Sequence, residues 1–448
     1  MRKNIVISAV AVGLLSSVNV YGAEDLSSMF SNGKVSGQIR EFSISRTYKK
    51  SDNSGYTRNG NAIGGHLTYE TDDFRGLSLG AAFYTTNAFA RSNEKSSKTT
   101  DPSLFGSNND SYSILGEAYL QYKFGKTLFK GGRQMLNTPL AGADDVRMLP
   151  DLFEAYILTN KDISDTTLVV GHLSKFAQGT FGRVYSSGLL SATSGYSNVD
   201  SKNQVGGFVN MGTYATGTST SGVTFGSVTY TGIKGLKVQL WDYYAHDISN
   251  SIYGQADLKW NCLFSDSVKP FASVQVIKQS DVGDKLLGKL DGTLVGGKIG
   301  AKVNNVTAYV AYTQTGKNSS SEAASGGYEN SIVTMWGGMP GFTQGMVTRH
   351  MFLAGTKATK VGAVYNFKDL GANATAAVYY LSHKMDENSG YGVSRRATEP
   401  GFDIKYYPEA VKNLQVRLRG NFPRKFAEST SGTKTGWNEY RFIVNYNF

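Results

Sequence analysis

The sequence is poor in several residue types, and each shortage restricts the possible class of protein. Its one cysteine, Cys262, cannot form an internal disulfide bond or supply a cluster of thiolate metal ligands. Eight prolines and a charged fraction of 18% are low for a soluble globular chain of 448 residues. After residue 22, no apolar run approaches the length of about 18 residues that a membrane-spanning helix needs, which excludes a helical membrane protein.

Small and aromatic residues are abundant instead. The chain has 52 glycines, 27 tyrosines and 23 phenylalanines, a composition typical of β-strands with small residues on one face. An aromatic fraction of 12% excludes a disordered chain, which cannot bury apolar surface. The formal charge of +11 is modest for this length, so the positions of the charges matter more than their sum. We expect no nucleic-acid partner, no cofactor and no metal site.

Residues 1–22 have the pattern of a secretory signal peptide. Arg2 and Lys3 precede an apolar stretch from Ile5 to Val20, and small residues follow near Gly22. We expect cleavage after Gly22, export from the cytoplasm, and a single folded domain over residues 23–448.

From residue 34 onward the chain repeats short segments in which apolar and polar residues alternate. In residues 252–260, for example, Ile252, Leu258 and Trp260 share one parity, and Asp257 and Lys259 share the other. Such alternation predicts strands with one face in an apolar medium and one in water. Eighteen segments qualify: 35–46, 62–70, 77–86, 112–124, 127–134, 153–160, 166–174, 222–231, 236–245, 252–260, 269–279, 294–303, 306–315, 357–367, 373–382, 401–407, 413–421 and 438–448.

The connections between these segments alternate between short and long. Short turns such as 125–126 and 304–305 follow one end, whereas long polar loops such as 135–152, 175–221 and 316–356 follow the other. The exception is 246–251, a short connection where a long loop is expected. An even number of strands with all long loops at one end is typical of an all-β, transmembrane, antiparallel β-barrel of about 18 strands.

The last strand ends in Phe448, and aromatic residues gather where strands meet connections, as in Tyr122 and Phe124. Terminal strands of bacterial outer-membrane proteins resemble this one, and the barrel-assembly machinery reads their final aromatic residue. We therefore expect the protein in the outer membrane of a Gram-negative bacterium, in contact with outer-membrane lipid.

Several segments together resemble the OprD-type family of substrate-specific outer-membrane porins. The similarity lies in the hairpin around Phe74-Arg75-Gly76-Leu77, in Gly132-Arg133-Gln134-Met135 with Asp144-Asp145-Val146-Arg147, in Trp241-Asp242-Tyr243-Tyr244, in Trp336-Gly337-Gly338-Met339-Pro340 and in Val416-Arg417-Leu418-Arg419. The resemblance implies an eighteen-stranded barrel, as a monomer or a homotrimer, with the third loop (about 135–152) folded inward as a constriction. It also implies a row of lumen-facing basic side chains that guides carboxylate-bearing solutes.

Strand parity locates candidates for that basic row. Cations on the water-facing parity are Lys123, Lys298, Lys302, Lys405, Arg417, Arg419 and Arg441, and the strands of Arg40 and Arg133 alternate less cleanly. A guanidinium group offers paired donors to a carboxylate and keeps its charge, which favours an anion-guiding role. The alternative is that lumen positions need only be polar.

The inward loop carries Asp144, Asp145 and Arg147. Opposite a basic wall, these charges would set up a field that orients zwitterionic solutes in the constriction. The alternative is an acidic patch on a solvated loop.

We predict passive diffusion of small anionic or zwitterionic carboxylates, such as amino acids or small organic acids, without enzymatic activity. Aromatic residues such as Tyr243 and Tyr253 leave a neutral oligosaccharide porin open, or they simply fill the wall. An enzyme or an adhesin on a barrel scaffold is the remaining alternative. The five histidines are scattered, no Gly-x-Ser-x-Gly elbow is evident and the sequence has no His-Glu-x-x-His motif, so no catalytic residue can be assigned from it.

Overall fold

The computed structural model describes residues 22–89, 98–185, 187–199, 206–391, 395–428 and 431–448. The predicted signal peptide, residues 1–22, lies outside the described residues except for Gly22. In the described part of the chain, no helix is both long and apolar enough to cross a membrane.

Eighteen long strands form the wall, as the alternation predicts. They are β1(Lys34–Lys50), β2(Thr57–Glu70), β3(Leu77–Ala88), β4(Tyr112–Phe124), β5(Thr127–Gln134), β6(Leu152–Asn160), β7(Thr166–Ala177), β9(Val223–Tyr230), β10(Leu236–Ala245), β11(Ser249–Lys259), β12(Val268–Asp281), β13(Thr293–Val303), β14(Val306–Thr315), β15(Lys357–Asn366), β16(Ala374–Met385), β17(Arg395–Tyr406), β18(Leu414–Asn421) and β20(Lys434–Asn447). Two further strands are two residues long, β8(Val209–Asn210) and β19(Ala427–Glu428).

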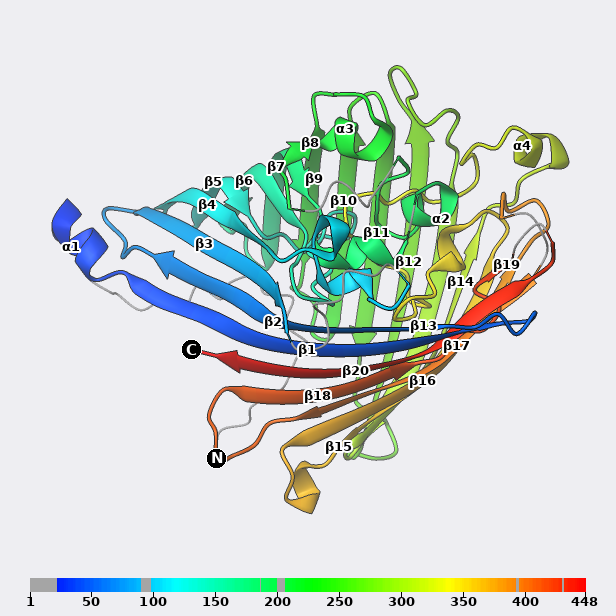
Figure 1. Ribbon diagram of the computed structural model, residues 1–448. Helices are drawn as coiled ribbons and strands as arrows, with labels where there is room; N and C mark the ends of the chain where they lie inside the picture. The colour runs from blue at the N-terminus through cyan, green and yellow to red at the C-terminus, as the bar shows by residue number, and fades with distance from the viewer. Residues whose placement is uncertain (1–21, 90–97, 186, 200–205, 392–394, 429–430) are drawn as a thin grey trace.

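The remaining elements are short helices outside the wall strands. They are α1(Leu26–Ser31), η2(Pro102–Leu104), η3(Ser107–Asn109), η4(Thr180–Val184), α2(Leu189–Ala192), α3(Met211–Thr216), α4(Ser320–Ala324), η5(His350–Phe352) and η6(Lys368–Leu370). α3 and α4 lie beyond the long-loop ends of the strands (Figure 1).

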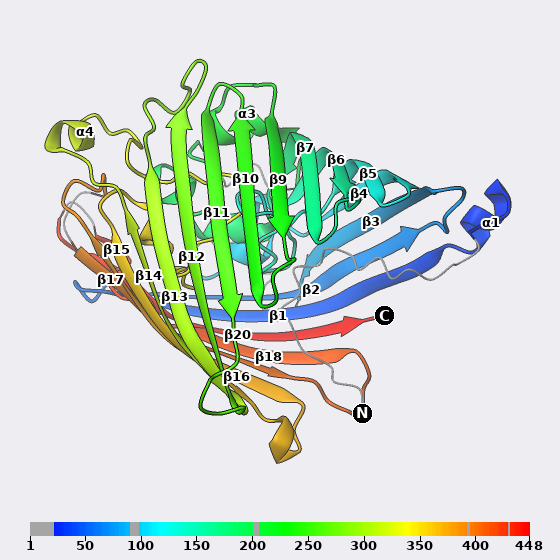
Figure 2. The same ribbon diagram turned by 180° about the vertical axis from the view of Figure 1, so that it is seen from behind.

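The sheet closes on itself. Each long strand is antiparallel to its neighbours, and β1 pairs with β2 on one side and with the last strand, β20, on the other. The register matches Ile39 with Tyr446 and Arg46 with Glu439. Main-chain bonds between Gly37 and Phe448, at 3.0 and 3.1 Å, complete this seam. The eighteen-stranded antiparallel barrel is therefore confirmed, and Figures 1 and 2 show its ring of strands from opposite sides.

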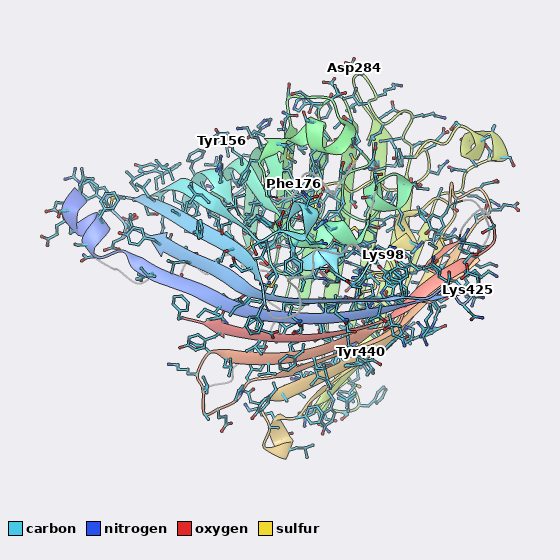
Figure 3. All side chains as sticks on the ribbon, in the orientation of Figure 1. Lys98, Tyr156, Phe176, Asp284, Lys425 and Tyr440 are labelled. Atoms are coloured by element: carbon cyan, nitrogen blue, oxygen red, sulfur yellow. The ribbon has the colours of Figure 1, made fainter. Side chains whose placement is uncertain are left out.

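The two faces of the wall differ in what they contact. Large apolar side chains such as Val276, Val295 and Val361 are exposed on the outer face, whereas Ile277 and Leu294, one residue away in their strands, are buried. Tyr156 and Tyr440 are exposed, and Phe176 is enclosed (Figure 3). An outer face of this kind suits a bilayer, because the backbone hydrogen bonds are all made within the sheet.

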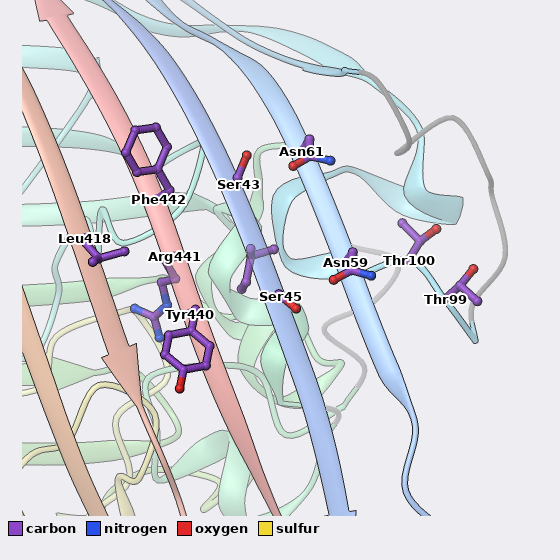
Figure 4. Close-up of a pocket in the computed structure, with 11 residues that line it drawn as sticks. Ser43, Ser45, Asn59, Asn61, Thr99, Thr100, Leu418, Tyr440, Arg441 and Phe442 are labelled. Carbon is purple, nitrogen blue, oxygen red and sulfur yellow. The ribbon is translucent and has the colours of Figure 1, made fainter.

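One stretch of the outer wall is polar. Ser43 lies opposite Asn61 and Ser45 opposite Asn59 in the β1–β2 register. Figure 4 shows these four side chains on the same face as Tyr440, beside a hollow that they line. The apolar band is therefore interrupted at the extracellular half of β1 and β2.

Two loops are shorter than the predicted strand bounds imply. β17 begins at Arg395 and not at residue 401, so the loop after β16 is reduced to residues 386–394. β1 continues to Lys50 and β2 begins at Thr57, so the predicted loop 47–61 shrinks to residues 51–56. The connection between β10 and β11 is a tight turn of residues 246–248, in which Asp247 has a φ of 61°. Described parts of three long loops pack together at the extracellular end of the barrel, where Leu136, Leu140, Met211, Tyr214 and Trp336 belong to one buried cluster.

Candidate functional site

The loop between β5 and β6, residues 135–151, is fastened to β1 by an ion pair. Arg40 on the inward face of β1 donates from Nη1 and Nη2 to the two carboxylate oxygens of Asp145, at 2.6 and 3.1 Å. Its Nε donates to Asn445 on β20 at 2.9 Å. Arg40, a candidate for guiding solute, is thus occupied in holding the loop, while the Asp145 side chain stays 41% exposed.

A second ion pair joins this loop to the loop between β14 and β15. Arg349 donates from Nη1 and Nη2 to Asp144 at 2.8 and 3.1 Å, and the Tyr196 hydroxyl donates to the same carboxylate at 2.5 Å. Both charged side chains are buried. Burial disfavours the charge of Arg349, but the Asp144 carboxylate more than compensates and raises the arginine's pKa above its usual value.

The third loop charge, Arg147, is enclosed by protein. Its Nη2 donates to Glu439 on β20 at 3.0 Å, its Nε donates to the Ser103 hydroxyl at 3.0 Å, and its guanidinium lies 4.8 Å from the Phe181 ring centre. Burial lowers the pKa of Arg147 to about 9, and the neighbouring Arg441 adds to that effect.

The loop charges are therefore placed differently from the field that the sequence suggests. Asp144 and Arg147 are buried in ion pairs that position the loop, because an unpaired charge in that interior would be costly. Of the three predicted charges, Asp145 alone keeps substantial exposure.

Four of the predicted cations come together on three neighbouring strands. Lys405 on β17 lies opposite Arg417 on β18, and Arg419 lies opposite Arg441 on β20. Asp403 sits among them and accepts from Arg417 Nε at 2.7 Å, with Arg419 Nε at 3.5 Å. One carboxylate thus faces three cations on this part of the wall.

Arg441 is the most enclosed of these four. It pairs with Glu439, which also pairs with Arg46 and Arg147, and it donates from Nη2 to Asn421 at 2.7 Å. Its charge is balanced within the wall and Arg419 is also buried, so Lys405 and Arg417 are the more exposed members of the group.

Lys298 and Lys302 extend the basic face onto β13. Lys298 Nζ lies 4.7 Å from the ring centre of Phe342, a residue of the loop 316–356. Lys302 is exposed and lies opposite Lys269 on β12, near the short-turn end. The sequence analysis missed Lys269, and it also missed Lys360 on β15, which donates to the Gln344 carbonyl at 2.6 Å. Both lysines lie on the inward parity of their strands, so the same alternation rule could have identified them.

The two remaining candidates lie apart from this group. Lys123 is exposed near the short-turn end of β4. The guanidinium of Arg133 stacks 4.4 Å from the Phe208 ring centre, beside Gly132, whose φ of 122° breaks the alternation of β5. That break explains why parity alone located Arg133 poorly.

Acidic groups also face the lumen, on β2 and β4. Glu70 accepts from Gln121 Nε2 at 2.9 Å, and Glu117 accepts from the Tyr84 hydroxyl at 2.7 Å. Neither glutamate was among the predicted site residues. The described lumen therefore presents Glu70 and Glu117 beside Lys123 on β2–β4 and an excess of cations on β12–β18, an uneven distribution that favours one orientation of a dipolar solute.

The geometry gives little support to histidine catalysis, to stacking of sugars on aromatic side chains or to metal binding. The buried His350 and His383 donate to main-chain carbonyls of Phe426 and Thr343, both at 3.0 Å. Tyr243 and Tyr253 are buried in apolar clusters. Within the described ranges, no three His, Cys, Asp or Glu side chains group as a metal site would require.

Comparisons with known proteins agree with this architecture. The family model described as outer membrane porin, OprD family, matches residues 28–448. OccAB3 of Acinetobacter baumannii is 17% identical, with a TM-score of 0.75 over 93% of this chain and 99% of that one. OpdK of Pseudomonas aeruginosa, solved with vanillate, is 15% identical, with a TM-score of 0.73 over 94% and 99%. OccK9 (OpdG) of Pseudomonas aeruginosa is 18% identical, with a TM-score of 0.72 over 94% and 99%. A search of curated proteins gives no match.

Proposed function

Because this chain belongs to the OprD family of outer membrane porins, we propose that it is a passive channel for small anionic or zwitterionic carboxylates. Amino acids and small organic acids are the solute classes in view. The channel needs no energy input and makes no covalent bond to its solute.

The observation that carries this proposal is the basic face of β17 and β18. Lys405, Arg417 and Arg419 project inward around a single carboxylate, Asp403. A carboxylate loses hydration when it enters a narrow channel, and fixed cations along the wall compensate for that loss. Arginine suits this role because its planar donors match the two oxygens of a carboxylate.

The loops supply the narrow part of the path. The ion pairs of Asp144 and Asp145 hold residues 135–151 against β1 and against the loop 316–356. A solute entering between the outer loops would pass this constriction beside the exposed part of Asp145. It would then follow Lys298, Lys405 and Lys302 toward the short-turn end.

Removing three lysines tests the proposal with little risk to the fold. Lys298, Lys302 and Lys405 have no ion-pair partner within the described residues, so Lys298→Gln, Lys302→Gln and Lys405→Gln together leave no buried acid unpaired. We expect the Kd for current block by benzoate to rise about fivefold, because benzoate on this path lies near one lysine at a time and one unit charge near a carboxylate in water is worth about 1 kcal/mol. Block by neutral benzamide should not change.

The matched control removes three lysines from the exposed short turns: Lys126→Gln, Lys234→Gln and Lys368→Gln. The control should keep the benzoate affinity of the parent channel. Equal loss in both triple variants, or no loss in either, would contradict the basic path. Selective block by neutral oligosaccharides would favour the sugar-porin alternative, and absence of conductance steps would favour an adhesin or an enzyme.

Recognition of Phe448 by the assembly machinery and the choice between monomer and homotrimer stay predictions. So does export by the signal peptide.

A further inference from the structure

Three cations form a row across the outer face of the barrel. Lys357 on β15 lies directly opposite Lys384 on β16, and Lys384 lies directly opposite Arg396 on β17. Neighbouring strands are about 4.8 Å apart, so the row places three positive charges within about 10 Å at the extracellular end of the wall.

The parity of these strands directs the row away from the lumen. Lys357, Lys384 and Arg396 are exposed, whereas the residues that alternate with them, Ala358, His383 and Ala397, are fully buried. The same outward face carries Val361 and Tyr380 further down. The row therefore plays no part in the solute path proposed above.

Within the described residues, none of the three cations has an acidic partner. Lys278 offers a contrast, because it also lies on the outer face at the extracellular end but pairs with Asp291. Like charges directly opposite each other in a sheet destabilise it, and cations on a lipid-facing wall are costly except near the interface. An anion bound across the row would remove that repulsion.

The surroundings of the row match a headgroup at the edge of a bilayer. Tyr380 lies four residues below Lys384 along β16, about 13 Å along the strand. Between them runs a row of hydroxyl groups, with Thr359 opposite Ser382 and Ser382 opposite Thr398. A groove of about 270 Å³ is lined by the three cations, by Thr359 and Ser382 and by Tyr380.

We propose that this groove binds the phosphate-bearing headgroup of an outer-leaflet lipid, with its acyl chains along the apolar wall below Tyr380. Lys357, Lys384 and Arg396 would contact the phosphate, and Thr359 and Ser382 would donate hydrogen bonds to the headgroup. A polar headgroup over an apolar tail fits the vertical order of the wall, cations above, hydroxyl groups between and valines below.

Native mass spectrometry of the full porin with bound lipid A, a bisphosphorylated glucosamine lipid, tests the site. We expect Lys357→Gln, Lys384→Gln and Arg396→Gln together to weaken lipid A binding about 100-fold, since each surface cation contributes about 1 kcal/mol near anionic headgroups. The matched control is Lys278→Gln, Lys285→Gln and Lys289→Gln, three cations of the β12–β13 hairpin that already have acidic partners. This control should bind as the parent does.

Two further arms leave the protein unchanged. Dephosphorylated lipid A should bind the parent porin and the Lys357, Lys384 and Arg396 variant equally well. Millimolar inorganic phosphate should not displace lipid A from the parent porin. Equal binding by both triple variants would overturn the site, and full displacement by inorganic phosphate would assign it to a free anion instead of a lipid. The heat-dependent shift in electrophoretic mobility of folded barrels verifies that each variant folds.

Discussion

A single buried residue, His350, makes the stability of this porin depend on pH. Its Nε2 donates to the Phe426 carbonyl at 3.0 Å, and its side chain is fully buried beside His383 and Tyr391. Burial lowers its pKa to about 3, and the neighbouring His383 adds to the effect. The folded protein therefore keeps His350 neutral at pH values well above 3.

The lowered pKa predicts a loss of stability in mild acid. An unfolded histidine titrates near pH 6.5, so between pH 6.5 and about 3 the unfolded chain binds a proton that the folded chain does not. The contribution of His350 to the free energy of unfolding should fall by up to ~1.4 kcal/mol per pH unit over this window and stay level above it. His350→Gln, which retains a donor for Phe426, should make the pH dependence of guanidinium unfolding between pH 7 and pH 5 shallower by up to that amount. Parallel pH profiles for the two proteins would contradict the assignment.

Among the elements, the constriction depends on close backbone contact between two loops. Gly142 donates from its amide to the Trp336 carbonyl at 2.9 Å, and Gly338 packs against residues 139–141. A Cβ at Gly338 would lie 2.5 Å from the Ala141 nitrogen, whereas one at Gly142 would meet nothing closer than 3.5 Å. The two glycines face the same contact but differ in the space available.

Gly338→Ala should therefore displace residues 135–151, while Gly142→Ala should be tolerated. We expect Gly338→Ala to cost about 1–3 kcal/mol of stability, as overpacking does, and to change the single-channel conductance. Gly142→Ala is the matched control and should keep the parent conductance. Identical conductance in all three proteins would show that this contact does not shape the constriction.

The elements could be predicted much better than the contacts between loops. Period-2 alternation located every long strand, because a bilayer outside and water inside impose opposite demands on successive residues. It missed the extracellular extensions of β1, β2 and β17, where Lys49, Arg58 and Arg396 lie beyond the apolar band. The partners of Arg147 and Asp144, Glu439 and Arg349, lie hundreds of residues away in the sequence, and no local pattern indicates them.

At the scale of the whole molecule, the closed barrel wall has one face toward lipid and one toward the water-filled lumen. Its outer face is mainly apolar, and its exceptions include the polar stretch around Ser43 and the cation row on β15–β17. Its inner face holds the loops and an excess of cations around Asp403. The net positive charge of the sequence is thus divided between the lumen and the lipid boundary, a division that composition could not reveal.

The reversal potential of the reconstituted parent channel in a KCl gradient tests the central claim most directly, because it reports the sign of the field in the lumen. The basic path predicts anion selectivity, and replacement of Lys298, Lys302 and Lys405 by Gln should move the reversal potential toward zero. A parent channel that prefers potassium ions would contradict the account.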